Sequence, residues 1–358
     1  MVMESQFPYE MPDLPDCNSQ CRTSESPDPE RSRQGADVCG MDSRKPAPFD
    51  ASQARVAILL CTCNGQRYLA EQLDSIAVQS HTNWQVHVSD DGSRDDTMAM
   101  LEKYREHWGS DRLFIYAGPT RGLVANFLSL TCNAAIQADY FAYADQDDVW
   151  AADKLQRAVT WLKGVAANIP ALYCSRTQLV DENGKHLGYS PLCKKPPAFA
   201  NALVQNIAGG NTMVFNVAAH ALLRESGEKV DVVMHDWWTY LVISGCGGQV
   251  HYDARPSLGY RQHGGNQVGS GTGWVSRGQR IGLLFKGSQQ SWNDRNIQAL
   301  QHLKYRLTPA NRKVFEEFST ARNRWLPARI RGVWCSGVYK QSSMATLGLL
   351  VAVIFKRI

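Results

Sequence analysis

Residues 55 to 155 repeat one pattern, in which a short apolar run is followed by a polar turn and then by apolar residues at helical spacing. The first unit is RVAILLCTCNG followed by QRYLAEQLDSIAVQS, in which Leu69, Leu73 and Ile76 recur every three or four residues. WQVHVSDDGSRDDT and LFIYAGP begin two further units of this kind. Alternating strands and helices predict an α/β fold with a mainly parallel sheet, whose ligands bind at the carboxyl ends of the strands.

The fourth strand of this pattern ends in three carboxylates, Asp145, Asp147 and Asp148, within YFAYADQDDVWAADKL. Like charges this close repel one another unless a positive group lies among them. The glycine-rich phosphate loops GxGxxG and GxxxxGK[ST] do not follow the strands, so a diphosphate at this acidic edge would need a divalent cation. Asp145 and Asp147 point to the same side of an extended segment, which predicts a site for Mg2+ or Mn2+. A solvated turn that caps the next helix is the alternative.

Composition and pattern divide the chain into four parts. Residues 1–53 are rich in Pro, Ser, Asp, Glu and Arg without apolar periodicity, which predicts a disordered tail. Residues 54–155 hold the strand and helix repeats, and residues 156–274 have a mixed pattern with turns such as DENGK. Residues 275–358 have the pattern of a helical C-terminal extension.

The extension ends in the apolar run MATLGLLVAVIF, followed by Lys356 and Arg357. The run is shorter than the roughly 20 residues that cross a bilayer, but an apolar helix flanked by Trp and bases suits a membrane surface. Packing on the domain or on a partner subunit is an equal alternative. No secretory signal pattern opens the sequence, so we expect a cytoplasmic protein, with peripheral contact to the inner face of the cell membrane as one reading of this helix.

The charge of the chain gives little indication of a partner. The formal net charge is +4, and acids and bases are interspersed through the middle of the sequence. Nucleic-acid binding usually requires a clustered basic surface, so we expect no nucleic-acid partner.

The order of the motifs resembles the nucleotide-binding half of the family 2 glycosyltransferases with a GT-A fold. The motifs are CTCNGQRYLAEQLDSI, SDDGSRDDT, RGLVANF and YADQDDVWAADKL. The later pieces LVDENGK, GGNTMVFN, HDWW and YRQHGGNQVG are similar to the rhamnosyltransferase-like branch that builds bacterial surface polysaccharides. The resemblance covers residues 55 to about 270 and implies a Rossmann-like, mainly parallel sheet flanked by helices.

The resemblance implies a nucleotide site at the first two strand ends. Thr62 and Asn64 would border the nucleotide, and Asp145 would lie near it. Asp91 would accept a hydrogen bond from the ring N3–H of uracil or thymine, with Asp90 supporting the turn. The alternative for these two residues is an ordinary turn followed by a helix cap.

The resemblance also implies a metal site, with Asp147 as the direct ligand and Asp145 and Asp148 beside it. His263 in YRQHGG matches a position where many members of the family place a further metal or diphosphate contact, and Arg261 would balance phosphate charge. A single histidine is otherwise more often an ordinary polar residue of the surface or core.

Sugar transfer to a hydroxyl also needs a base, and Asp236 in VVMHDWWTYL matches the catalytic base of the family. His235 stands where many relatives have a second acid. Trp237 and Trp238 would form an apolar wall for a sugar. The alternative is an acid at the start of a helix, with both tryptophans in the core. The acceptor side would be lined by Gly209, Gly210 and Asn211, because backbone without side chains allows close approach.

Together these predictions describe an inverting, metal-dependent glycosyltransferase that moves L-rhamnose from dTDP-rhamnose onto a lipid-linked or cell-surface glycan. The nearest alternative is the same scaffold with a UDP-hexose donor, namely UDP-galactose, UDP-glucose or UDP-N-acetylglucosamine. A catalytically idle carbohydrate-binding scaffold is an alternative of another class. The presence of both Asp147 and Asp236 disfavours it.

Overall fold

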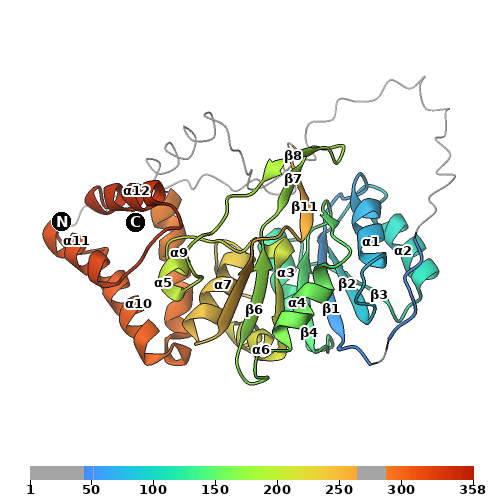
Figure 1. The fold of residues 1–358 in the computed structure, drawn as a ribbon, viewed down its shortest axis with the longest axis horizontal. Helices are drawn as coiled ribbons and strands as arrows, with labels where there is room; N and C mark the ends of the chain where they lie inside the picture. The colour runs from blue at the N-terminus through green and yellow to red at the C-terminus, as the bar shows by residue number, and fades with distance from the viewer. Residues whose placement is uncertain (1–43, 51, 264–287) are drawn as a thin grey trace, which may run out of the picture. The chain divides into compact units, whose positions relative to one another are not determined.

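A seven-stranded sheet lies at the centre of the computed structural model, which describes residues 44–50, 52–263 and 288–358 (Figure 1). The strand order is β10-β6-β9-β4-β1-β2-β3. Strand β9 runs antiparallel to β4 and β6, whereas β1 to β4 pair in parallel, as do β6 and β10. The strands are β1 (Val56–Thr62), β2 (Trp84–Asp90), β3 (Leu113–Ala117), β4 (Tyr140–Ala144), β6 (Ala171–Ser175), β9 (Val214–Asn216) and β10 (Gln249–Asp253).

Strand β1 shows why the first apolar run carries no polar alternation. All seven of its residues are buried, because helices cover both faces of the sheet. Side chains alternate between two apolar cores, with Ile58 in one and Leu59 in the other. The core around Ile58 includes α1 (Leu69–Ala77), α2 (Thr97–Trp108) and α4 (Lys154–Leu162). The core around Leu59 includes α3 (Leu123–Cys132), α5 (Phe199–Ala202), α6 (Val217–Ser226) and α7 (His235–Gly245).

A second sheet of four strands brings distant parts of the chain to the acidic turn. Its order is β5-β11-β7-β8, and the strands are β5 (Val149–Trp150), β7 (Gln178–Val180), β8 (His186–Tyr189) and β11 (Leu258–Arg261). β5 follows the acidic residues directly, and it pairs antiparallel with β11 through Trp150 and Leu258. This pairing places the end of β11 beside the turn after β4.

The C-terminal segment is helical, as expected. It contains α9 (Ser288–His302), a short 3-10 turn η3 (Lys304–Arg306), α10 (Pro309–Ala321), α11 (Leu326–Cys335) and α12 (Ser343–Ile354). The helices α10 to α12, orange to red in Figure 1, contribute residues to the core around Leu59. The predicted α/β class, the mainly parallel sheet and the helical extension are therefore confirmed, while residues 275–287 lie outside the described part.

Residues 44–50, predicted to belong to the disordered tail, instead contact the domain. The indole Nε1 of Trp108 donates to the carbonyl of Arg44 at 2.9 Å, and Arg112 Nη2 donates to the carbonyl of Ala47 at 2.6 Å. The Arg112 guanidinium also lies 3.7 Å from the ring centroid of Phe49. Trp108 on α2 and Arg112 before β3 are buried donors that need these acceptors, and composition alone does not reveal this requirement. The rest of the predicted tail, residues 1–43, lies outside the described residues.

Candidate active site

Asp90 joins the turns that follow β1 and β2. Its carboxylate accepts from the hydroxyl of Thr62 at 2.8 Å, from the backbone N–H groups of Gly92 at 3.2 Å and Ser93 at 2.8 Å, and from the Ser93 hydroxyl at 2.5 Å. The backbone N–H of Asn64 donates to the Ser93 hydroxyl at 2.8 Å. Thr62, Asn64 and Asp90 therefore lie together, and Asp90 has the geometry of the predicted turn support.

Asp91 accepts two hydrogen bonds from the segment between β3 and α3. The N–H groups of Thr120 and Gly122 donate to its two carboxylate oxygens at 2.6 and 2.8 Å. Each carboxylate oxygen can accept more than one hydrogen bond, so Asp91 has room to accept a further one from a pyrimidine ring. That contact stays a prediction.

Gln146, the middle residue of the acidic turn, fastens that turn to the end of β1. The N–H of Cys63 donates to Gln146 Oε1 at 2.9 Å, and Gln146 Nε2 donates to the Cys63 carbonyl at 3.1 Å. Gly65 leaves room for this amide, since a Cβ there would lie 2.3 Å from Gln146 Oε1. The sequence prediction considered only the acids of this motif and missed the role of Gln146. A side-chain amide has both a donor and an acceptor, so it can bond to the N–H and the carbonyl of one backbone residue.

Asp148 is fully buried and bonds to the protein. Asn211 Nδ2 donates to its Oδ2 at 2.6 Å, and the backbone N–H of Arg261 approaches Oδ1 at 3.4 Å. Burial raises the pKa of Asp148 well above its usual value, with Asp147 and Asp145 adding to the rise, while Asn211 and Lys154 oppose it. Asp148 thus joins the acidic turn to the predicted acceptor-side residue Asn211.

Lys154 is a buried cation beside the carboxylates. The side chain is fully buried at the start of α4, its ammonium donates to the carbonyl of Asn211, and Nζ lies 3.5 Å from the Trp150 ring centroid. Burial lowers the pKa of Lys154 well below its usual value, while the charges of Asp148 and Asp145 act in the opposite direction. The sequence predicted a positive group among the acids and assigned it to a metal ion. The structure shows a buried lysine at this position as well, and the metal ion stays a prediction.

Asp145 carries a strongly perturbed carboxyl group. Its pKa is raised to about 7, mainly by burial and in part by the charges of Asp147 and Asp236, while Lys154 acts to lower it. The Coulombic effect of Asp236 shows that the acidic turn and the predicted base belong to one electrostatic neighbourhood. A cation bound at this edge would favour the charged form of Asp145.

Asp147 and His263 meet in space, as the resemblance implies. Asp147 Oδ2 and His263 Nε2 lie 2.7 Å apart, and about a fifth of each side chain is exposed. The imidazole also stacks on Tyr68 at 5.2 Å between ring centroids. Carboxylate oxygen and imidazole nitrogen are donors that suit Mn2+, and carboxylate suits Mg2+. Over the described ranges no group of three His, Cys, Asp or Glu is arranged around a metal position, so this pair fits a metal as a partial ligand set.

Arg261 lies behind the acidic turn. It is 1% exposed, and its guanidinium donates to the carbonyls of Asp147 and Glu182 at 3.0 and 2.7 Å and to the Glu71 carboxylate at 2.6 Å. It also lies 4.5 Å from the Tyr68 ring centroid. These contacts contradict the predicted direct balance of phosphate charge, because a guanidinium enclosed by the protein is not presented to a ligand. Arg261 instead positions Asp147.

Asp236 lies in the first turn of α7 and is 9% exposed. The N–H of Gly210 donates to its Oδ2 at 3.1 Å, and the N–H of Trp237 donates to its Oδ1 at 2.6 Å. Burial raises the pKa of Asp236 to about 6, although both backbone hydrogen bonds lower it. A carboxyl group with a pKa near neutrality suits proton abstraction, and the structure brings it together with the Gly209–Asn211 turn.

His235 occupies the space beside Gly210. A Cβ on Gly210 would lie 2.6 Å from His235 Nε2, so the glycine accommodates the imidazole. The ring stacks on Phe127 at 3.8 Å between centroids, and neither ring nitrogen has a hydrogen-bond partner in the described part of the chain. Burial lowers the pKa of His235 to about 3, which keeps the ring neutral. The prediction explained the glycine at position 210 by the close approach of a sugar. The structure adds a second reason, which is the space that His235 occupies.

Both tryptophans after Asp236 lie in the core. Trp238 is fully buried, and its Nε1 donates to the Ser226 hydroxyl at 3.1 Å. Trp237 is 6% exposed, and its Nε1 donates to the carbonyl of Ala202 at 2.7 Å. The alternative interpretation, in which the tryptophans pack the core, describes them better than the predicted sugar wall.

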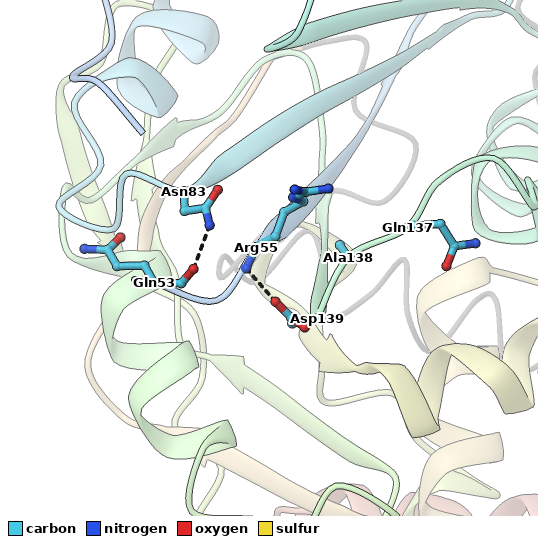
Figure 2. Close-up of a pocket in the computed structure, with 6 residues that line it drawn as sticks. All are labelled: Gln53, Arg55, Asn83, Gln137, Ala138 and Asp139. Carbon is cyan, nitrogen blue, oxygen red and sulfur yellow. Dashed lines mark hydrogen bonds between the residues drawn. The ribbon is translucent and has the colours of Figure 1, made fainter. Parts of the chain in front are cut away.

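A polar cavity of about 440 Å³ lies away from these residues, at the amino end of β1 (Figure 2). Within it, the N–H of Arg55 donates to Asp139 at 2.7 Å and Asn83 Nδ2 donates to the carbonyl of Gln53 at 2.6 Å. None of the predicted site residues lines it. Ligands of parallel sheets bind at the opposite edge, where Thr62 lies.

Comparison with known proteins gives a consistent set of matches. Residues 57–224 match the model of the family described as Glycosyl transferase family 2. The dTDP-rhamnosyl transferase RfbG of Shigella flexneri is 25% identical over 233 residues, which cover 63% of this chain and 78% of that protein. The putative glycosyltransferase EpsE of Bacillus subtilis is 32% identical over 112 residues, which cover 31% of this chain and 40% of that protein.

Among solved structures, S. aureus TarS 1-349 in complex with UDP-GlcNAc is similar at a TM-score of 0.48 and 16% identity, with 84% of each chain covered. The range matched by the family model contains Asp91, Asp145 and Asp147 and ends before Asp236 and His263.

Proposed function

We propose that this chain, whose residues 57–224 match the model of glycosyl transferase family 2, is an inverting glycosyltransferase in which Asp236 is the catalytic base. The observation that carries the proposal is the position of Asp236. Its carboxylate is buried beside the acidic turn, its pKa is raised to about 6, and its charge acts on Asp145. A second acid near the turn at which we propose that the diphosphate binds would supply the proton acceptor that sugar transfer requires.

In the proposed reaction, Asp236 takes the proton of an acceptor hydroxyl as the hydroxyl oxygen attacks the anomeric carbon of the donor. The N–H groups of Gly210 and Trp237 orient the carboxylate and leave it further lone pairs for that proton. The bond from the anomeric carbon to the diphosphate breaks in the same displacement, so the configuration inverts once. A β-linked donor would give an α-linked product.

We propose that Asp147 and His263 hold a divalent cation, Mg2+ or Mn2+, with Asp145 beside it. A bound cation would offset the negative charge of the departing diphosphate. The chain contributes the frame of this site: Gln146 fastens the turn to β1, and Arg261 holds the carbonyl of Asp147.

The donor that we propose is dTDP-rhamnose. The similarity to RfbG, which is described as a dTDP-rhamnosyl transferase, supports this choice, as do the motifs that resemble the rhamnosyltransferase-like branch. A UDP-hexose is the second candidate. A hydrogen bond from the ring N3–H to Asp91 would not distinguish them, because thymine and uracil share that donor. We propose a hydroxyl of a lipid-linked or cell-surface glycan as acceptor, reached at the inner face of the cell membrane.

The test is a panel of dTDP-rhamnose, UDP-glucose, UDP-galactose and UDP-N-acetylglucosamine, with Mg2+ or Mn2+ and then with chelator. Donor binding and donor hydrolysis are measured for the wild type, for Asp236→Asn and for the exposed control Asp111→Asn. We expect metal-dependent selection of dTDP-rhamnose, and a loss of turnover of about 10³-fold in Asp236→Asn with donor binding kept. Failure to bind any nucleotide sugar with either metal would eliminate the enzyme and favour a carbohydrate-binding scaffold.

A further inference from the structure

The last two helices present large apolar side chains to solvent. On α11, Leu326, Ile330 and Trp334 are exposed at intervals of four residues, with Trp334 76% exposed. On α12, Met344 is 77% exposed, and further exposed apolar residues follow it along the helix. We call this set the C-terminal surface; it consists of Trp325, Leu326, Ile330, Trp334, Met344, Leu347, Val351, Ile354 and Phe355.

One face of α12 packs against the domain, and the exposed apolar side chains of this helix lie outside that face. Leu349, Ala352 and Val353 are buried in the core around Leu59. Met344, Leu347, Val351 and Ile354 recur every three or four residues, so they lie on another side of the helix. A helix that had only to pack on the domain would have polar residues on this side.

Buried arginines fix the position of α12. Arg329 Nη2 donates to the carbonyl of Ile354 at 3.3 Å, and Arg322 Nη2 donates to the carbonyl of Ile358. At the other end, the Ser342 hydroxyl caps the helix by accepting from the N–H of Ala345 at 3.1 Å. The outer face of α12 is therefore presented in a defined orientation.

The sequence that contains α11 and α12 carries charge of one sign. Residues 318–358 contain seven Lys or Arg and no Asp or Glu, whereas the rest of the chain has 31 bases and 34 acids. Four of the seven bases, Arg324, Arg331, Lys356 and Arg357, are exposed. The surface thus combines exposed Trp and aliphatic groups with bases, which complements an anionic lipid surface. A protein partner would be selected by area and shape, whereas exposed bases together with tryptophans on the same two helices favour lipid headgroups.

We propose that the C-terminal surface binds an anionic membrane, with its apolar side chains at the boundary between headgroups and acyl chains and the four exposed bases at lipid phosphates. No helix of residues 44–50, 52–263 and 288–358 is long and apolar enough to cross a membrane. The inference deepens the proposed function, because it would bring the site to a lipid-linked acceptor. It does not depend on that function, since vesicle binding requires no sugar.

The experiment is flotation of the full chain with vesicles of phosphatidylcholine alone or mixed with phosphatidylglycerol, at low and high salt. We expect binding to the mixed vesicles and its weakening by salt. Arg324→Gln with Arg331→Gln should weaken it roughly 30-fold at low salt, as estimated for two surface bases. The control pair Lys103→Gln with Lys185→Gln removes the same charge elsewhere and should bind as the wild type does.

The apolar part of the surface is tested by Leu347→Ser and by Trp325→Ala with Trp334→Ala, against the exposed control Val217→Ser. We expect the first two variants to lose vesicle binding while circular dichroism and thermal unfolding match the wild type. Absence of flotation with anionic vesicles would overturn the proposal, as would flotation that none of these variants weakens. A dimer in the absence of lipid that the Trp variants dissociate, without any vesicle binding, would assign the surface to a second copy instead.

Discussion

Two groups of carboxylates lie at the carboxyl edge of the central sheet, and they differ in how the protein treats their charge. On the β2 side, Asp90 and Asp91 accept six hydrogen bonds from hydroxyl and backbone N–H groups of neighbouring turns. On the β4 side, burial raises the pKa of Asp145 to about 7 and that of Asp236 to about 6. The first group holds neighbouring turns together through hydrogen bonds. The carboxyl groups of the second can bind a proton or a charged ligand. Perturbed carboxyls of this second kind are typical of functional sites.

We expect the largest effect on stability from Lys154, the buried basic residue beside the second group of carboxylates. Lys154→Met should lower the free energy of unfolding by about 3–5 kcal/mol, because it leaves Asp148 and Asp145 without their buried positive neighbour. Urea unfolding at neutral pH measures this change. Lys163→Met, which changes an exposed lysine directly after the last residue of α4, is the control and should have little effect. Equal stability of both variants would contradict the assignment of Lys154 as a charge partner.

A smaller effect is expected at the contact that orients Asp236. Gly210→Ala places a Cβ 2.6 Å from His235 Nε2, which should cost about 1–3 kcal/mol in unfolding free energy and reduce turnover by displacing the N–H that holds Asp236. Adding His235→Ala creates space for the new methyl group. We expect the double variant to recover part of the turnover that Gly210→Ala loses. A double variant no more active than the single one would show that the clash is not the cause.

The smallest effect is a pH dependence that separates the two groups. With a pKa of about 6, Asp236 is charged above that pH and accepts a proton; below it the group is protonated and inactive as a base. We therefore expect kcat/KM to fall about tenfold per pH unit below about pH 6 and to level off above it. Asp90→Asn, which weakens the link between the turns that follow β1 and β2, should change the plateau value without moving this apparent pKa. A profile that is flat from about pH 5 to 7 would exclude Asp236 as the titrating base.

The sequence predicted the parts of this site that depend on local pattern. The strand and helix alternation located Thr62, Asp90 and Asp145 at one edge, because the carboxyl ends of parallel strands converge there. The meeting of Asp147 with His263 followed from family resemblance, since no local signal connects positions 116 residues apart.

The residues that sequence reasoning missed or misjudged depend on burial and on distant partners. Lys154 has the pattern of an ordinary residue at a helix start, and only its enclosure between Trp150 and Asn211 makes it a charge partner. Arg261 is enclosed because β11 pairs with β5 and β7, and Trp238 because α7 is buried along its whole length. Residue type reports what a side chain can do, whereas long-range packing decides whether a ligand can reach it.

The bonding of Asp148 has a consequence for the order in which the chain acquires its structure during synthesis. Its two partners, Asn211 and Arg261, lie 63 and 113 residues farther along the chain. The acidic turn is therefore translated long before the groups that complete it, and the nascent chain exposes that turn to water until β11 has left the ribosome. Contacts of such large sequence separation form late and slow the overall folding reaction. Strands β1 to β4 can pair before these partners are synthesised, but the surroundings of the acidic turn are complete only once β11 has paired with β5 and β7.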